Sequence, residues 1–350
     1  MTINYHSGRR IQGTSTDSTA VSGGWKEVGR TTLGSDASTI TVSSLPDKRY
    51  YMVLTQGKTS QTNGDFALRY NGDSGSNYAV RQTWNGGSDN TYVNQSYIRP
   101  LGTVLDLPFL NIDYISNKSD KEKLIIGHGI DDTVSGAGTA PTREEHVAKW
   151  TNTSDALSQV QALLVNGSPN YRSGSEVVVL GWDEDDTHST NFWEELGTAN
   201  LSGGTADLLN ITSFTAKKYL WIQYYIEEST ANANARLTFN NDTGSNYAYR
   251  RSLNGGTDYT GTSKAYISPD GFEAGNKLVN MFIINNSATE KLIISNSITN
   301  ATAGAGNAPT RCEMTFKWTN TSSQITRIDL TNSDSGEMGT GSILKVWGSN

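Results

Sequence analysis

Cysteine is almost absent from this sequence: Cys312 is the only one among 350 residues. One thiol cannot form an intramolecular disulfide, and it cannot build a cysteine-based zinc site. Charge is also sparse, because charged residues make up 18% of the chain, and the formal net charge is -7. Lys and Arg form no cluster, so the basic surface that a nucleic-acid partner requires is missing, and we expect no such partner.

Long apolar stretches are missing as well. No run approaches the ~20 residues that a helix needs to cross a bilayer. The segment Met1–Arg10 has no apolar core of the kind found in signal peptides. We therefore expect no membrane association, and synthesis in the cytoplasm without a signal peptide.

What the sequence does contain is an internal repeat, which fixes the architecture before any other feature. Asn71–Ala79 reads like Asn240–Ala248, and Lys149–Ser154 recurs unchanged as Lys317–Ser322. The copies are therefore 169 and 168 residues apart at these two places. Other matched segments, in the same order, are Trp25 with Trp193, Glu122–Ile126 with Glu290–Ile294, and Gly136–Arg143 with Gly304–Arg311.

A repeat of this length is a whole domain, since solenoid turns and propeller blades run to only ~20–50 residues. The matched blocks place an N-terminal arm at residues 1–23 and a first domain at 24–183. An acidic linker follows at 184–190, and a second domain occupies 191–350.

Short runs rich in β-branched and aromatic residues fill both copies, with Gly, Ser, Thr and Asn between them. Turn dipeptides occur at Asn71-Gly72, Asn85-Gly86 and Asn166-Gly167. No segment keeps a helical period over three turns. The sequence therefore predicts an all-β protein of two tandem antiparallel β-sandwich, jelly-roll-like domains.

One loop in each copy spaces oxygen-bearing side chains as calcium loops do, with glycines between them. Each loop carries a single carboxylate and lacks the distal Glu of a full calcium motif, so a tight turn closed by Asx hydrogen bonds is the competing interpretation. No other metal or cofactor is expected. The candidate ligands are Asn71, Asp73 and Asn77 in the first copy and Asn240, Asp242 and Asn246 in the second.

No arrangement of residues indicates catalysis. His128 aligns with Asn296 and His146 with Met314, so neither histidine serves a role shared by both copies. Glu144 and Glu145 are adjacent and would point to opposite faces of a strand, so they cannot act as a pair of catalytic carboxylates. We expect packing or surface roles for the histidines, no catalytic residues and no enzymatic activity.

The tryptophans divide into two groups. Trp25 with Trp193, and Trp150 with Trp318, keep the register of the strand pattern and are expected to fill the cores. Trp84 aligns with Leu253 of the second copy and is the candidate for stacking on a sugar. A glycan is therefore a second possible partner.

Three segments carry a resemblance to a known class of proteins: Tyr70–Ala79, Phe239–Ala248 and Gly341–Gly348. They are similar to the repeated β-domains in structural proteins of tailed phages and related viruses of marine microbes. The likeness covers nearly all of residues 24–350 and excludes the arm. It implies a decoration, fibre or appendage protein, and it implies no catalytic residues.

The sequence and this resemblance together predict a virion structural protein on the particle surface. It would be made in the host cytoplasm and act by assembly with its own copies and with other virion proteins. A homo-oligomer is expected, with a trimer as one closed form. Two alternatives stay open: a tandem carbohydrate-binding module for host adhesion, and a double-jelly-roll major capsid protein.

Overall fold

The computed structural model describes residues 21–22, 24–60, 64–183, 186–188, 190–228, 233–270, 275–300, 302–332, 334 and 336–350. Strands, turns and bends make up this part of the chain, and it contains no helix that could cross a membrane. Most of the predicted N-terminal arm and part of the linker lie outside the described residues. Val21–Ser22 (β1) pairs with Thr187–His188 (β14), so the end of the arm lies beside the linker.

The first domain is an antiparallel sandwich of one large and one small sheet. The large sheet contains, in spatial order, β2 (Lys26–Thr32), β13 (Glu176–Trp182), β4 (Tyr50–Gly57), β9 (Phe109–Ser116), β10 (Lys123–Asp131), β11 (Glu144–Trp150), β6 (Tyr78–Trp84) and β7 (Asn90–Gln95). The small sheet contains β3 (Thr39–Val42), β12 (Val160–Val165), β5 (Gly64–Tyr70) and β8 (Thr103–Val104).

Within the described residues, the second domain repeats this arrangement strand for strand, and the positions that correspond to β8 lie outside them. Its large sheet contains β15 (Glu194–Asn200), β25 (Ile343–Ser349), β17 (Tyr219–Ile226), β21 (Asn276–Ile284), β22 (Lys291–Asn300), β23 (Thr310–Trp318), β19 (Tyr247–Leu253) and β20 (Tyr259–Lys264). Its small sheet contains β16 (Leu208–Ile211), β24 (Ile328–Asn332) and β18 (Ala235–Phe239).

The predicted turns form as the sequence indicates. Asn71 and Gly72 both have positive φ angles, and so do Asn85 with Gly86 and Asn166 with Gly167. Two successive positive φ angles define the type I′ turn, whose twist matches that of paired antiparallel strands. Asn and Gly tolerate these angles better than other residues, which is why they stand at these positions. The prediction of tandem antiparallel β-sandwiches is confirmed.

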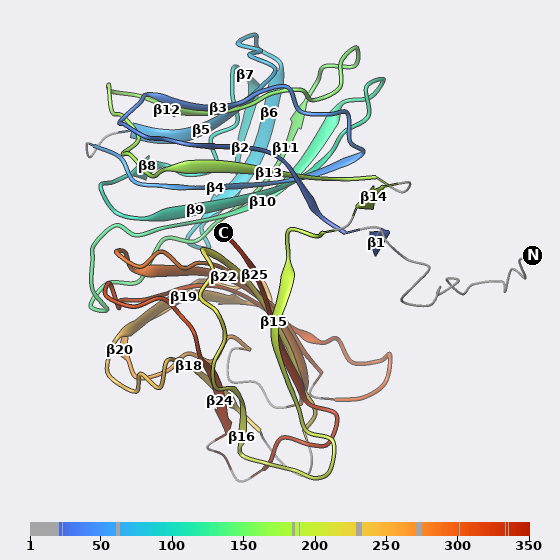
Figure 1. Ribbon diagram of the computed structural model, residues 1–350, viewed down its shortest axis with the longest axis vertical. Coiled ribbons are helices and arrows are strands. Elements are labelled where there is room, and N and C mark those ends of the chain that lie inside the picture. The colour runs from blue at the N-terminus through green and yellow to red at the C-terminus, as the bar shows by residue number, and fades with distance from the viewer. Residues whose placement is uncertain are drawn as a thin grey trace, which may run out of the picture.

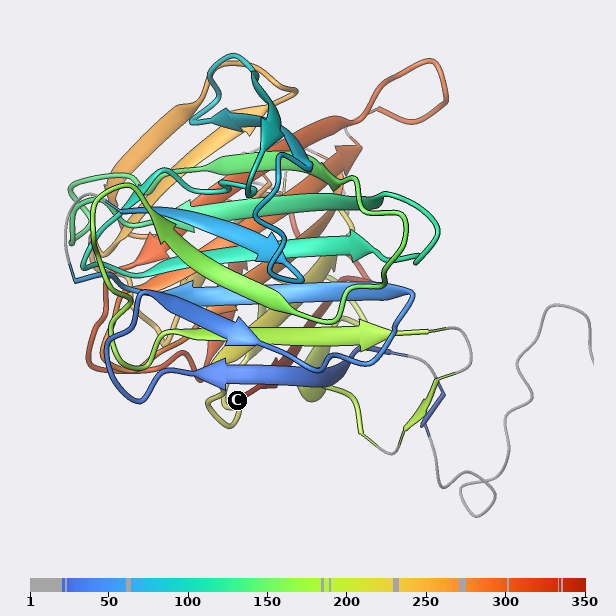
Figure 2. The same cartoon turned by 90° about the horizontal axis from the view of Figure 1, so that it is seen from above.

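The two domains stack with their large sheets facing each other, so the small sheets form the outermost layers (Figure 1). Seen from above, the strands of one large sheet cross over those of the other (Figure 2). We call the side of each large sheet that faces away from its own small sheet its outer face. Parts of these outer faces are buried between the domains, and other parts are exposed to solvent.

Each sandwich has its own core, and an additional core lies between the domains. Trp150 and Trp318 are fully buried inside the first and second sandwich, as predicted. The same prediction is wrong for Trp25 and Trp193, which pack in the cluster between the domains. Both begin their domains at the edge strand of the large sheet, where the side chain reaches the outer face and not the interior.

Candidate functional site

The two predicted calcium loops are closed by their own hydrogen bonds. The Asp73 carboxylate accepts from the backbone of Gly75, from the Asn77 amide, and from Nε1 of Trp150 at 2.7 Å. Burial opposes ionisation, but these hydrogen bonds lower the pKa of Asp73 below its usual range. Asn71 turns away from the others, and its side-chain oxygen accepts from the backbone before β12.

The second copy repeats these contacts. Asp242 accepts from Gly244, Asn246 and Trp318, and Asn240 accepts from the backbone that leads into β24. Within the described part of the chain, no group of three His, Cys, Asp or Glu side chains could hold a metal. Calcium binding here stays a prediction, and the hydrogen bonds explain the loops without an ion.

Trp84 lies at the end of β6 and is half-buried. The guanidinium of Arg99 lies over its ring, 5.3 Å from the centroid, and also over the ring of Tyr92 at 5.7 Å. Arg99 in turn pairs with Asp65 at 2.8 Å. One face of Trp84 is therefore covered by a cation, and sugar stacking on this ring stays a prediction.

Beside Trp84 lies a small pocket of about 120 Å³. It is lined by Val80, Gln82, Tyr92, Gln95, Tyr97 and Arg99. The Gln82 side chain is buried, and neither its amide nitrogen nor its amide oxygen has a hydrogen-bond partner. A buried amide without partners costs free energy, and the two Gln82 atoms are almost inaccessible to solvent although the residue lines this pocket.

Inside the first sandwich, a histidine lies between two carboxylates. Nε2 of His146 is 2.8 Å from Asp113, and its Nδ1 is 3.1 Å from Glu144. All three side chains are fully buried, and Asn111 donates to Asp113 at 2.7 Å. A Cβ atom at Gly127 would lie 2.1 Å from the His146 ring, so the glycine leaves the space that the histidine fills.

The electrostatics of this cluster follow from its burial. Burial opposes protonation of His146, but the two carboxylates outweigh it and raise the pKa of His146 to about 10. Burial raises the pKa of Glu144 to about 7, although the histidine opposes that shift. Burial and the positive charge on His146 lower the pKa of the nearby His128 to about 4. The cluster therefore holds an imidazolium between carboxylates in the core.

The second domain has no such cluster at the matching positions. The residues in register with Asn111, Asp113, Glu144 and His146 are Val279, Met281, Cys312 and Met314. All four belong to the buried interior of the second sandwich. The same fold is therefore stable with an ionic cluster in one copy and an apolar core in the other. The alignment of His146 with Met314 is the sequence signal of this difference between the copies.

The outer faces of the two large sheets form a continuous apolar cluster across the domain boundary. The first domain contributes side chains from β4, β9, β10 and β13, and the second contributes its first residues with parts of β17, β21 and β22. The buried members are Met52, Leu54, Leu110, Ile112, Ile130, Val178, Leu180, Phe192, Trp193, Tyr219, Ile284, Leu292 and Ile294. Burial of these apolar side chains stabilises the contact between the two domains.

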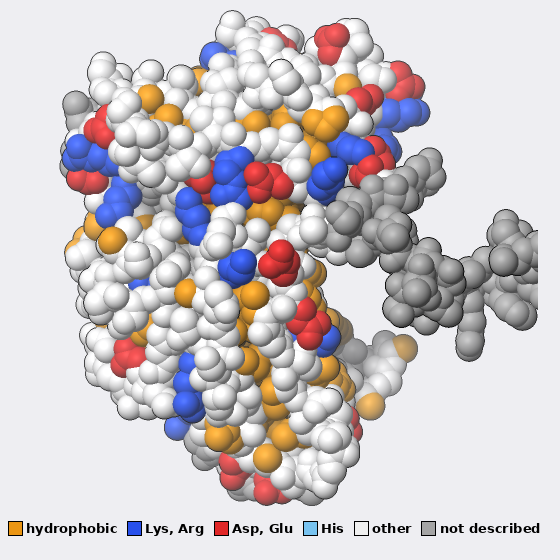
Figure 3. Space-filling view, viewed as in Figure 1, with side chains coloured by type: hydrophobic (Ala, Val, Ile, Leu, Met, Phe, Trp, Pro, Cys, Tyr) orange, Lys and Arg blue, Asp and Glu red, His pale blue; other side chains and the backbone are white. Residues whose placement is uncertain are grey.

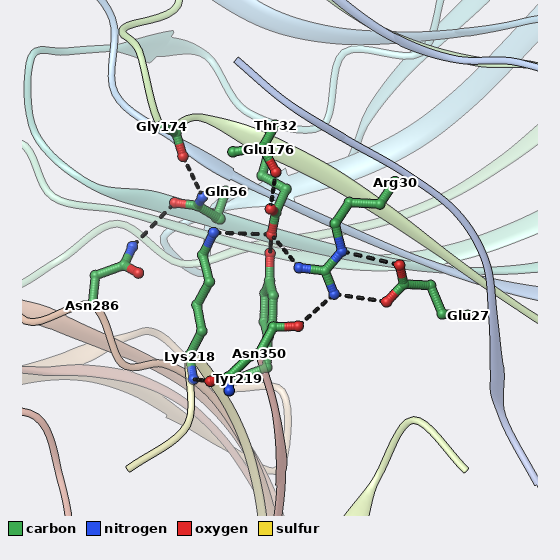
Figure 4. Close-up of polar contacts among 10 residues, drawn as sticks. All are labelled: Glu27, Arg30, Thr32, Gln56, Gly174, Glu176, Lys218, Tyr219, Asn286 and Asn350. Atoms are coloured by element: carbon green, nitrogen blue, oxygen red, sulfur yellow. Dashed lines mark hydrogen bonds and ion pairs between the residues drawn. The ribbon is translucent and has the colours of Figure 1, made fainter. Parts of the chain in front are cut away.

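A polar network centred on Glu176 lies at one edge of this interface (Figure 4). The buried carboxylate accepts from Lys218 at 3.0 Å and from the Tyr219 hydroxyl at 2.8 Å, both in the second domain. Thr32 and Arg30 of the first domain donate to it as well. Burial opposes ionisation, but these donors outweigh it and lower the pKa of Glu176.

A second set of charged contacts lies at the other edge. Arg143 of the first domain is 2.6 Å from Asp258 of the second. Lys317 of the second domain contacts Asp132 of the first and lies 3.3 Å from Glu290 of its own domain. These pairs fix the lateral position of the sheets, because buried charges must meet opposite charges.

Part of the first domain's outer face is left open. Leu124, Ile126 and Val147 of β10 and β11 are all about half exposed. Together with Ala79 and Lys149 they line a shallow apolar groove of about 440 Å³. The face shown in Figure 3 carries scattered charges of both signs, with hydrophobic side chains among them, most continuously on the lower domain. An open apolar area of this kind is a candidate contact site.

No protein-family model matches the chain, and a search of curated proteins finds no match. Among solved structures, the chain is similar to domains LG4-5 of the mouse laminin alpha1 chain. The identity is 11%, over 93% of this chain and 90% of that chain, with a TM-score of 0.19. Human GIVD cytosolic phospholipase A2 in complex with methyl gamma-linolenyl fluorophosphonate is 10% identical over 78% of this chain and 33% of that chain, with a TM-score of 0.14. Scores this low carry no argument about function, and the β-sandwich assignment rests on the strand pairing alone.

Proposed function

We propose that this chain is a non-enzymatic building block of a virus particle surface, which assembles through the outer faces of its large sheets. The observation that carries the proposal is the open apolar area formed by Leu124, Ile126 and Val147 on the first domain. Water-exposed strands normally alternate apolar and polar residues, whereas Leu124, Ile125 and Ile126 of β10 form an unbroken apolar run, as in a strand covered on both sides.

The duplication supports this reading. The sequence Lys-Leu-Ile-Ile begins β10 at Lys123 and begins β22 at Lys291. In the second domain both faces of this segment are buried, whereas in the first the outer face is open. The same segment thus forms an internal contact in one copy and is available for an external contact in the other. The resemblance to repeated β-domains of phage structural proteins supports a decoration, fibre or appendage role, with other virion proteins as partners.

The test is the assembly state of the purified chain. We expect species larger than a monomer in sedimentation velocity across a micromolar concentration series, and regular rings, fibres or shells in negative-stain electron micrographs. The change Leu208→Asp, on the exposed edge of a small sheet, should leave assembly unaffected and serves as the control. A chain that stays monomeric throughout, and that is absent from its source particle, would contradict the proposal.

A second candidate function, glycan binding, is favoured by the pocket at Gln82. A sugar hydroxyl can donate to and accept from the amide that now has no partner, while Tyr92 and Tyr97 supply ring contacts. The second domain has Gly261 in place of Tyr92, so binding would be confined to the first domain.

The change Gln82→Leu is expected to weaken binding on a glycan array by about tenfold or more, because a bound hydroxyl would lose its partner. The variant should fold normally, since the amide makes no hydrogen bond in the protein. The matched control is Gln161→Leu on the small sheet, which should bind as the unchanged chain does. Equal glycan signals for all three proteins, or no signal from any, would eliminate this function.

A further inference from the structure

The contact between the two domains joins unlike surfaces. From the first domain, Leu110 of β9 and Ile130 of β10 face the interface, and they are direct neighbours across the sheet. From the second domain, Leu292 and Ile294 of β22 face it. Because the domains are copies, the second domain should carry counterparts of Leu110 and Ile130, and the first domain should carry counterparts of Leu292 and Ile294. These counterparts are the unused halves, because the contact within the chain does not involve them.

The second domain carries the unused copy of the first half. Leu278 and Ile298 stand in register with Leu110 and Ile130, and they too are direct neighbours across the sheet. Leu110 and Ile130 are 1% and 0% exposed, whereas Leu278 and Ile298 are 48% and 46% exposed. We call Leu278 and Ile298 the domain-two patch.

The first domain carries the unused copy of the second half. Leu124 and Ile126 stand in register with Leu292 and Ile294. The exposed fractions are 58% and 56% for the first pair against 0% and 4% for the second. We call Leu124, Ile126 and the adjoining Val147 the domain-one patch. At these positions both unused halves are thus apolar and open to solvent.

A charged contact between the domains also has an unused counterpart. Arg143 of the first domain binds Asp258 of the second, and their counterparts are Arg311 and Asp89. The residue types are unchanged and both counterparts are exposed. Among the described residues, each pairs with a neighbour in the chain, Arg311 with Glu313 at 3.2 Å and Asp89 with Arg81 at 3.5 Å. At these positions the unused halves match in charge as well as in apolar character, whereas Gln223, Asn280 and Lys345 stand in register with Leu54, Ile112 and Val178 of the first half.

The loop that precedes β11 completes the correspondence. In the first domain, the carbonyl of Ala137 accepts from Ser263 of the second domain at 2.7 Å, and the carbonyl of Pro141 accepts from Arg250 at 3.0 Å. The matching loop of the second domain, Gly304–Arg311, is exposed over nearly its whole length. It would find the corresponding strands β6 and β7 on the first domain of another copy.

We propose that copies of this chain bind head to tail, with the domain-two patch of one copy on the domain-one patch of the next. This contact repeats between molecules the one that already joins the domains within each molecule. It rests on the proposed function and names its partner, which is a second copy of the chain. A head-to-tail contact of this kind closes into a ring or continues as a filament, depending on the rotation between copies.

The experiment uses two changes at exposed positions, Ile126→Asp and Ile298→Asp, with Leu208→Asp as the control. Each patch variant alone should sediment only as a monomer at concentrations where the unchanged chain and the control assemble. A mixture of the two variants should give one-to-one dimers and nothing larger, since each supplies one intact patch. Unaltered circular dichroism and melting temperature check that the variants fold.

Charge reversal tests the register of the contact. Arg311→Asp alone and Asp89→Arg alone should each weaken assembly by about tenfold or more, because like charges would meet. An equimolar mixture should recover assembly, since every contact between the two variants pairs opposite charges. Recovery in the mixture requires that these two side chains face each other across copies.

The outcomes separate this inference from the proposed function. If Ile126→Asp abolishes assembly and Ile298→Asp does not, the domain-one patch pairs with itself, and the head-to-tail contact is overturned while an assembly function stands. The same holds if the mixed variants never form dimers although the unchanged chain assembles. An unchanged chain that remains monomeric at all concentrations overturns both.

Discussion

The change His146→Met is expected to lower the free energy of unfolding of the first domain by about 3–5 kcal/mol. Asp113 and Glu144 lie 2.8 Å and 3.1 Å from the imidazole and are fully buried. Removing the histidine leaves these carboxylates in the core without their cation. The cost of an unpaired buried charge exceeds the small gain from the apolar side chain.

The second domain supplies the matched control. A variant with Asn111→Val, Asp113→Met, Glu144→Cys and His146→Met carries the residues found at the same positions of the second sandwich. Its stability is expected to equal that of the unchanged chain or to exceed it by about 1–4 kcal/mol, since well-packed apolar residues often replace a buried ion cluster without loss. Chemical denaturation measures both variants. Equal losses in the single and the fourfold variant would show that packing, and not charge, is responsible.

The pH dependence of the unchanged chain gives an independent check. The pKa of His146 is raised from 6.5 to about 10, so its stabilising contribution is complete below pH 6.5 and is lost as the pH rises towards 10. The pKa of Glu144 lies near 7 and that of His128 near 4, so neither titrates in the upper part of this range. The stability difference between the unchanged chain and His146→Met should therefore shrink between pH 7 and 10.

The sequence predicts the fold well because the repeat and the turn chemistry are local signals. Asn-Gly pairs place turns between successive strands, and two copies of one pattern fix the architecture. The ionic cluster escaped prediction for a different reason. His146 on β11 and Asp113 on β9 flank the same strand, β10, but they lie far apart in the sequence. The alternation of apolar and polar residues along a strand does not reveal the order of strands in the sheet. The available signal was His146, a polar residue at an inward-facing strand position where the second copy has Met314.

The interface between the domains was not predictable in the same way. Alternation along a strand shows which side chains face the core, but an apolar outer face gives no information about what covers it. Trp25 illustrates this limit, because its apolar character was assigned to the sandwich core and the structure places it between the domains. Leu124 and Leu292 have the same sequence neighbours and opposite exposure, so their difference comes from tertiary packing alone.

The change Glu176→Ala is expected to lower the free energy of unfolding by about 2–3 kcal/mol and to loosen the coupling between the domains. The carboxylate accepts from Lys218, Tyr219 and Thr32, and the Tyr219 hydroxyl is fully buried. That hydroxyl would lose its acceptor. Lys218 and Arg30 are partly exposed and so recover some hydration, which keeps the expected loss below that of His146→Met.

The measurement is differential scanning calorimetry, in which weaker coupling should split the unfolding of the two domains into separate transitions. The control is Glu176→Gln, which retains an acceptor for Tyr219 and should lose less than Glu176→Ala. The lowered pKa of Glu176 means that its contribution is present above its ordinary value of 4.5 and is lost as the pH falls through the folded value. The unchanged chain and Glu176→Gln differ only by this charge. Their free energies of unfolding should therefore become equal as the pH falls. A constant difference from pH 7 into that acid range would mean that the ionised carboxylate does not hold the domains together, and that the apolar cluster alone does.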